Sequence, residues 1–131
     1  MPRFVNDKQY ASVLALDGPK RFKHLVAQVA DWGEVWGLRT AEGWMLVQDD
    51  AGNIAFPIWP HERYAVGYND ATSSGCQAVS IEVHEFVDTW LPRFADEGNQ
   101  LAVFPTLADR AIFVTPDLLS IAIREELSGL E

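Results

Sequence analysis

The chain has 131 residues, 48% of them hydrophobic and 22% charged, which is typical of one soluble globular domain and excludes a disordered or fibrous protein. Its net charge of −9 is uneven: residues 1–24 carry +3 and the remainder carries −12. Because an acidic surface repels phosphate backbones, we do not expect nucleic-acid binding. We expect a single domain, with a basic helical segment at 1–32 and an acidic α+β body at 33–131.

The cellular compartment is predicted from the apolar stretches, the first residues and the cysteine content of the sequence. No stretch reaches the roughly 18 apolar residues of a membrane span, and the start, MPRFVNDKQY, has no apolar signal-peptide core. Cys76 is the only cysteine, which excludes an internal disulfide and suits a reducing compartment. We therefore expect a cytoplasmic protein with no membrane contact.

Two helices are predicted in the first 32 residues. In NDKQYASVLAL, Asn6 or Asp7 is suited to cap a short helix. In DGPKRFKHLVAQVADW, Gly18 can cap and Pro19 suits the first helical turn, where its missing N–H costs nothing. An apolar stripe at helical spacing follows, formed by Phe22, Leu25, Val26 and Val29.

Three strands are predicted next, because EVWGLRT, WMLVQ and IAFPIW are short runs rich in branched and aromatic residues, separated by turn residues. They predict an antiparallel meander, with Gly43 and Gly52 at positive φ in the connecting loops. Since Pro57 cannot donate to a ladder, the strand at 54–59 is expected at a sheet edge or with a bulge.

The second half predicts helices alternating with strands. Pro60 is expected in the first turn of a two-turn helix at 61–68, followed by the polar loop NDATSSG and the strand QAVSIEV. Residues 83–95 have the strongest amphipathic pattern, in which Pro92 should kink or restart the helix. A hairpin of LAVFP and AIFV around TLADR precedes a last helix from Thr115 to about Leu127.

These elements predict an α+β fold. We expect a mainly antiparallel sheet, made of the three-stranded meander plus two or three further strands, covered by four or five helices. The pattern lacks the strand–crossover–strand periodicity of a doubly wound parallel sheet.

Several motifs resemble the bacterial family known as domain of unknown function 2750. They are VWGL at 35–38, GW at 43–44, PIWPHERYA at 57–65, EFVDTWLP at 85–92 and VFP at 103–105. The most specific of them places Trp59 five residues before Tyr64 and Pro60 five residues before Ala65. The resemblance runs from about Tyr10 to the last helix. It implies a small bacterial α+β domain, and it implies no reaction or catalytic residue.

A candidate ligand pocket is formed by aromatic residues in the middle of the chain: Trp36, Trp44, Trp59, His61 and Tyr64. Indole and phenol rings offer a flat apolar face with one polar group, as ligand pockets often require. The same rings are ordinary core material, and their strand and helix periodicities favour that interpretation. His61 beside Glu62 could act as a general base, or could simply fill space and bond a backbone carbonyl.

A candidate anion site lies at the start of the second helix, where Lys20, Arg21, Lys23 and His24 occur together. The helix dipole disfavours cations there, so an anion against the free N–H groups would explain them. Intramolecular pairing or a solvated face is the favoured explanation, because exposed charges placed against the dipole cost only about 0.3 to 1 kcal/mol.

The remaining chemistry-bearing residues indicate no site. His84 and Asp88 share a helical face but have no third ligand, so we expect no metal. DDAGN is interpreted as a hairpin turn because position 12 from Asp49 is Pro60. We find no motif for a cofactor or phosphate, no catalytic constellation, and for Cys76 no basic neighbour that would activate it.

Three functions remain open. The first is a non-enzymatic acidic binding protein for a basic protein partner, antitoxin-like or immunity-like, using the acidic body together with the edge at 57–68. The second is a small-molecule-binding domain or minor enzyme that uses the aromatic pocket. The third is homo-oligomerisation of the basic segment against the acidic body.

Overall fold

A computed structural model describes residues 4–107 and 111–129, and it confirms the α+β fold. The helices are α1 (Asp7–Leu14), α2 (Gly18–Trp32), α3 (Glu62–Thr72), α4 (Val83–Glu85), α5 (Leu91–Glu97) and α6 (Pro116–Gly129), with a π-helical segment η1 (Phe86–Trp90). The strands are β1 (Glu34–Thr40), β2 (Gly43–Trp44), β3 (Val47–Gln48), β4 (Ile54–Ile58), β5 (Gln77–Glu82), β6 (Gln100–Val103) and β7 (Ile112–Val114).

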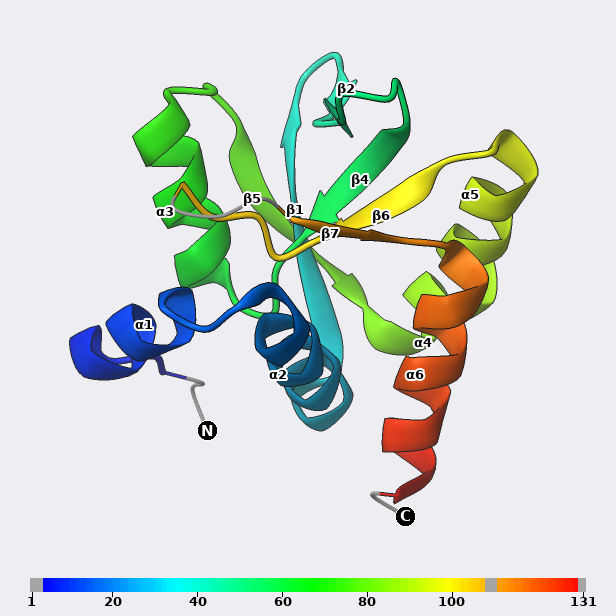
Figure 1. The fold of residues 1–131 in the computed structure, drawn as a ribbon, viewed down its shortest axis with the longest axis horizontal. Coiled ribbons are helices and arrows are strands. Elements are labelled where there is room, and N and C mark those ends of the chain that lie inside the picture. The colour runs from blue at the N-terminus through cyan, green and yellow to red at the C-terminus, as the bar shows by residue number, and fades with distance from the viewer. Residues whose placement is uncertain (1–3, 108–110, 130–131) are drawn as a thin grey trace.

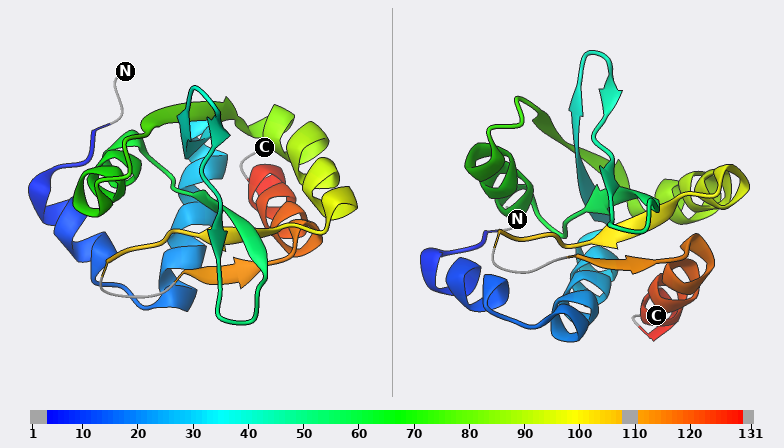
Figure 2. Two further views of the ribbon diagram at one scale, coloured as in Figure 1. Left: turned by 90° about the horizontal axis from the view of Figure 1, so that it is seen from above. Right: turned by 45° about the horizontal axis from the view of Figure 1, so that its top comes forward.

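The strands form two sheets, in the orders β2-β1-β5 and β3-β4-β6-β7. Every pairing is antiparallel except that of β4 with β6. A two-residue bridge joins the sheets, because Trp36 and Trp59 exchange backbone hydrogen bonds of 2.8 and 2.9 Å. The α3 helix lies at one end of the sheets and α4, α5 and α6 lie at the other (Figures 1 and 2).

The predicted meander is divided between the sheets. Its second strand consists of β2, paired with β1, and β3, paired with β4. Met45 and Leu46 lie between them, so this segment passes from one sheet to the other. Gly43 and Gly52 have the predicted positive φ angles, 145° and 88°.

Of the two expectations for β4, an edge position or a bulge, the edge position is wrong, because β3 and β6 flank the strand. The carbonyl of Ile58 accepts from Phe104, toward β6. Pro57 precedes it by one residue, so its backbone faces the opposite side. On that opposite side of β4, the last residue paired with β3 is Ala55, and the next paired residue is Trp59, which bridges to Trp36 of β1. The missing N–H therefore faces a gap in the ladder, which a central strand tolerates.

The helix boundaries differ from expectation around α3. Pro60 precedes the cap residue His61 and is not in the first turn, and residues 69–72, predicted as loop, are helical. Polar side chains alone do not end a helix; here Ser73 ends it by adopting a left-handed φ of 52°. The caps of the first two helices are Asn6, as predicted, and Asp17 in place of the expected Gly18.

The predicted interruption at Pro92 is confirmed. The helical run from Val83 to Glu97 passes through η1 before α5 begins at Leu91, whose N–H bonds to the Phe86 carbonyl. The wider turn suits a proline in the next turn, since Pro92 has no N–H for the Asp88 carbonyl.

The C-terminal predictions also hold. Strands β6 and β7 form the predicted antiparallel hairpin, although residues 108–110 of the expected TLADR turn lie outside the described residues. In α6, the Thr115 hydroxyl accepts from the Leu118 N–H as a cap. The core contains residues of both sheets and of the helices, among them Leu25, Phe56, Trp59, Phe86 and Leu119.

Candidate functional site

Two neighbouring cavities lie beside α3. The larger, which we call the outer cleft, has a volume of about 490 Å³. The smaller, which we call the inner chamber, measures about 180 Å³. Their common wall is Tyr68 with the segment Pro105–Leu107.

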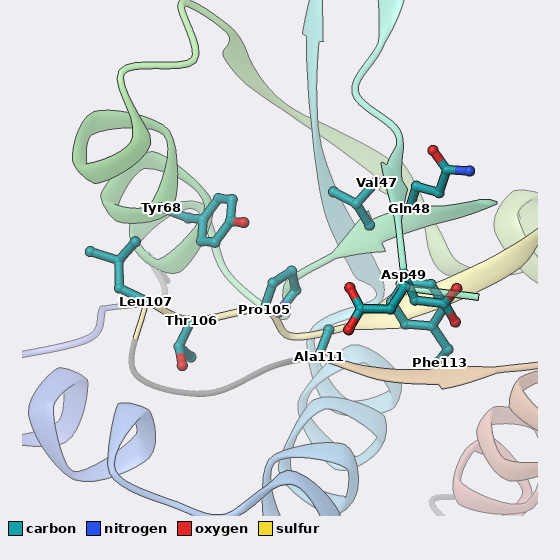
Figure 3. A pocket seen from close by; sticks show the side chains of 10 residues that line it. Val47, Gln48, Asp49, Tyr68, Pro105, Thr106, Leu107, Ala111 and Phe113 are labelled. Atoms are coloured by element: carbon teal, nitrogen blue, oxygen red, sulfur yellow. The ribbon is translucent and has the colours of Figure 1, made fainter. Parts of the chain in front are cut away.

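The outer cleft is bounded by α3, the β3–β4 hairpin and β7 (Figure 3). Besides the common wall it is lined by Val47, Gln48, Asp49, Asp50, Ala111 and Phe113. The two aspartates give its rim negative charge. Asp49 is also structural, because its carboxylate accepts from the N–H groups of Ala51 and Asn53 and from the Asn53 amide. Hydrogen bonds from Asn53 are the main reason that the pKa of Asp49 is lowered.

The inner chamber has a predominantly apolar wall. Besides the common wall it is lined by Tyr10, Leu14, Tyr64, Gly67 and Ala71. Because Tyr64, Gly67, Tyr68 and Ala71 follow a spacing of i, i+3, i+4 and i+7, one face of α3 supplies this side. The chamber therefore lies between α1, α3 and the segment after β6.

The common wall is held by two buried side chains from distant elements. The Trp59 indole N–H donates to the Pro105 carbonyl at 3.1 Å, and Arg21 Nε donates to the Phe104 carbonyl at 3.3 Å. Phe104 has a left-handed φ of 55°, a conformation that bulky residues rarely adopt. This strained residue turns the chain out of β6 and directs Pro105 toward α3.

Tyrosine contacts shape the chamber. Tyr10 stacks on Tyr64, with ring centres 5.4 Å apart, and the Arg63 guanidinium lies over the Tyr10 ring at 4.4 Å. A Cβ at Gly67 would lie 2.1 Å from the Tyr10 hydroxyl oxygen, so this close approach requires glycine. Burial raises the pKa of Tyr64 to about 12, and its hydroxyl has no hydrogen-bond partner among the described residues.

The five residues of the predicted aromatic pocket lie in different surroundings. Trp59 and Tyr64 are fully buried, whereas Trp36, Trp44 and His61 are half-buried. Trp44 packs against Phe56 and edge-on against Trp90, where it helps to join the sheets to η1. Of the five, Tyr64 is the one that lines the inner chamber, and none lines the outer cleft.

His61 is the cap of α3. Its Nδ1 accepts from the Arg63 N–H at 3.0 Å, so the ring bonds a backbone donor where a carbonyl had been expected. It lies edge-on to Trp32, with ring centres 5.4 Å apart. Neither cavity includes His61 in its wall.

The four residues of the predicted anion site are not gathered on one surface. Lys20 and Lys23 are exposed, whereas Arg21 is 1% exposed and directed inward. Burial lowers the pKa of the half-buried His24, whose Nε2 has no partner among the described residues. One free N–H group at the start of α2 is capped, because the Lys20 N–H donates to the Asp17 carboxylate at 3.0 Å.

Other expected features can be placed as well. His84 Nδ1 lies 2.9 Å from Glu82, while Asp88 bonds Arg124 at 3.0 Å. Within residues 4–107 and 111–129, no three His, Cys, Asp or Glu side chains are close enough to share a metal ion. The half-buried Cys76 immediately precedes β5. None of the helices described here is both long and apolar enough to cross a membrane.

Sequence reasoning missed most of this site. The face containing Tyr64 and Tyr68 follows from helical periodicity, but the contribution of α1 and of Pro105–Leu107 depends on contacts between distant segments. Gly67, a glycine inside a predicted helix, was the one local signal of a close approach.

Comparison with known proteins places the chain in a family. No curated protein and no solved structure gives a significant match. The model of the family described as "Protein of unknown function (DUF2750)" matches residues 22–123, which include every strand of both sheets and the common wall of the two cavities. The chain therefore belongs to the DUF2750 family.

Proposed function

We propose that the protein is an acidic binding protein that recognises a basic protein partner. The observation that carries this proposal is a concentration of carboxylates on the helices at one end of the molecule. Residues 82–97 and α6 together contain eight acidic residues against two arginines. All eight are exposed: Glu82, Glu85, Asp88, Asp96, Glu97, Asp117, Glu125 and Glu126.

These residues, which we call the acidic helical face, belong to elements that lie together. Helices α5 and α6 pack against each other, and α4, α5 and α6 occupy the same end in Figure 1. Arg124 bonds Asp88 and His84 bonds Glu82, so two of the few basic groups are already engaged. A negative field remains, and it would steer a cationic partner at low ionic strength.

The segment 57–68 contributes little to such a surface. Pro57, Ile58, Trp59 and Pro60 are all buried, so this part of the expected edge belongs to the core. Masking of a basic toxin is one form that binding through the acidic helical face would take.

The proposal is tested with two matched variants. Glu85→Gln, Glu97→Gln and Glu126→Gln together neutralise three charges of the acidic helical face. Asp31→Asn, Glu62→Gln and Asp70→Asn remove the same charge from exposed positions on α2 and α3. Proteins captured from native lysate by the wild-type chain are identified by mass spectrometry, and the affinity of the purified partner for all three chains is then measured.

We expect a basic partner whose affinity falls about tenfold in the first variant, since three exposed charges at roughly 0.5 kcal/mol each amount to about 1.5 kcal/mol. The control variant should bind like the wild type, and added salt should weaken every complex. Equal affinities for the two variants, or a complex insensitive to salt, would refute the acidic helical face as the binding surface. So would the capture of no basic protein.

A second candidate function is small-molecule binding, which the two cavities beside α3 favour. Of the residues predicted from the sequence for this function, only Tyr64 lines one of the cavities. The other candidate binding residues are those that line the outer cleft and the inner chamber. A metabolite screen followed by amide chemical shifts tests it; perturbations confined to the walls are expected, and a screen without any would count against it.

A further inference from the structure

In the part of the chain that the structure describes, three of the four sheet edges are very short and the fourth is long. The edges are β2 and β5 of one sheet and β3 and β7 of the other. Strands β2 and β3 have two residues each and β7 has three, whereas β5 has six. Figure 2 shows β5 at the margin of the molecule. Because very short edges resist pairing with another chain, β5 is the edge at which such pairing can occur.

The hydrogen bonds of β1 show which backbone groups of β5 point out of the sheet. Trp36 exchanges backbone bonds with Trp59, so its N–H and carbonyl point away from β5. Opposite residues of an antiparallel ladder behave alike, and Trp36 lies opposite Ser80. The N–H and carbonyl of Ser80 therefore point outward, as do those of Ala78 two residues earlier. Outside the ladder, no described residue bonds the backbone of Ala78 or Ser80.

Strand β5 also lacks the features by which edge strands avoid pairing. Its sequence, QAVSIE, contains no proline, lysine or arginine, and no bulge interrupts its register with β1. Its one charged residue is Glu82, at the last position, and Ser80 near its centre is exposed. Both the donors and the acceptors of this edge are thus accessible to a further strand.

The strand is complementary to itself about Ser80. When two copies pair antiparallel with Ser80 opposite Ser80, Ala78 lies opposite Glu82 and Val79 lies opposite Ile81. This register opposes no like charges and covers the half-buried Val79 with an apolar side chain. The outward groups of Ala78, Ser80 and Glu82 would form about six hydrogen bonds between the copies. A register centred on Glu82 would instead oppose two carboxylates.

We propose that two copies of this chain associate through β5, antiparallel and centred on Ser80, so that their β2-β1-β5 sheets become one continuous sheet. Such a contact has two-fold symmetry and closes after two copies. It differs from pairing of the basic segment with the acidic body, and it does not depend on a basic partner. Because each copy carries a net charge of −9, salt should strengthen this dimer, whereas salt should weaken a complex with a basic partner.

Sedimentation equilibrium over about 5 to 500 µM measures the association, because small interfaces bind weakly. Ser80→Pro removes the outward N–H and leaves the bonds to β1 intact, as edge strands tolerate. Ser80→Lys opposes two like charges at the two-fold axis. The controls are Ser80→Thr, which keeps the backbone donor, and Ala27→Lys, which adds the same charge at an exposed position of α2.

We expect the wild type and both controls to dimerise, and Ser80→Pro and Ser80→Lys to dimerise about tenfold more weakly. Thermal melting establishes that each variant is folded. The Ala27→Lys control separates the position of the added charge from its effect on the net charge.

Disulfide cross-linking tests the register, in a Cys76→Ser background that contains no other thiol. Ser80→Cys should form a covalent dimer under mild oxidation, because opposite Cα atoms of a hydrogen-bonded pair lie about 5.5 Å apart, within disulfide range. Gln77→Cys is equally exposed on β5 but should remain monomeric, since the two cysteines would lie about 20 Å apart in this register.

Each contrary outcome overturns a defined part of the proposal. A wild-type chain that stays monomeric at the highest concentration refutes the dimer. A dimer that both Ser80→Pro and Ser80→Lys leave unchanged, or that salt dissociates, refutes β5 as its interface. Cross-linking of Gln77→Cys in place of Ser80→Cys refutes the register. If the wild type is monomeric and Ser80→Pro abolishes capture of another protein, that protein occupies the edge and the second copy is refuted.

Discussion

Replacing Arg21 by methionine should destabilise the protein strongly. Its guanidinium is 1% exposed and donates to two backbone carbonyls, Phe104 through Nε and Leu16 through an amino group. Methionine fills similar space but leaves the buried Phe104 carbonyl and the partly buried Leu16 carbonyl without these donors. Hydrogen bonds to charged groups contribute roughly 1.5 to 3 kcal/mol each, so we expect a loss of about 3 to 5 kcal/mol. For a domain of this size, that lowers Tm by about 10 to 20 °C.

The assay is urea denaturation followed by tryptophan fluorescence, with two companion variants. Lys23→Met removes a charge from the exposed side of the same helix and should change the free energy of unfolding by less than about 0.5 kcal/mol. Arg21→Lys keeps the charge but loses the forked geometry, and should lie between wild type and Arg21→Met. If Arg21→Met unfolds at the same urea concentration as Lys23→Met, the structural role assigned to Arg21 is refuted.

Two further predictions concern the common wall and pH. Trp59→Phe should cost about 1 to 2 kcal/mol, because the Pro105 carbonyl loses its donor; unchanged denaturation would contradict this. Burial lowers the pKa of His24 below 6.5, so the unfolded chain binds a proton more readily than the folded one. The stability from neutral His24 is complete above pH 6.5 and declines as pH falls through this value toward the folded pKa. His24→Gln should therefore flatten the decline in urea midpoint between about pH 7.5 and 5.5, whereas equal slopes would refute the assignment.

Local patterns predicted the elements well because their causes are local. The apolar spacing around Leu25, the cap at Asn6 and the proline break at Pro92 depend on neighbouring residues, and the structure reproduces all three. Ser73 shows the limit of local patterns. The polar residues before it were predicted to form a loop, but α3 continues through them and ends only where Ser73 adopts a left-handed backbone conformation.

The sheet arrangement was harder to predict because it depends on which strands meet. Pro57 correctly indicated a position where the ladder has no N–H donor, but an edge strand and a gap inside a sheet satisfy that requirement equally. The parallel pairing of β4 with β6 could not be predicted from local patterns, because the two strands are neighbours in the sheet although α3, β5 and α5 lie between them in the chain. The same applies to the candidate anion site, where side-chain spacing could not reveal that Arg21 is directed inward.

The motif that best identifies the family also builds the cavity walls. Trp59, Pro60, Tyr64 and Ala65 are all buried, and of these four only Tyr64 lines a cavity. Trp59 holds the Pro105 carbonyl and its ring packs against Tyr68, while Tyr64 stacks on Tyr10. One motif thus positions Pro105 and Tyr68 of the common wall together with the inner side of the chamber. For this reason the position of the cavities follows from the packing of the core.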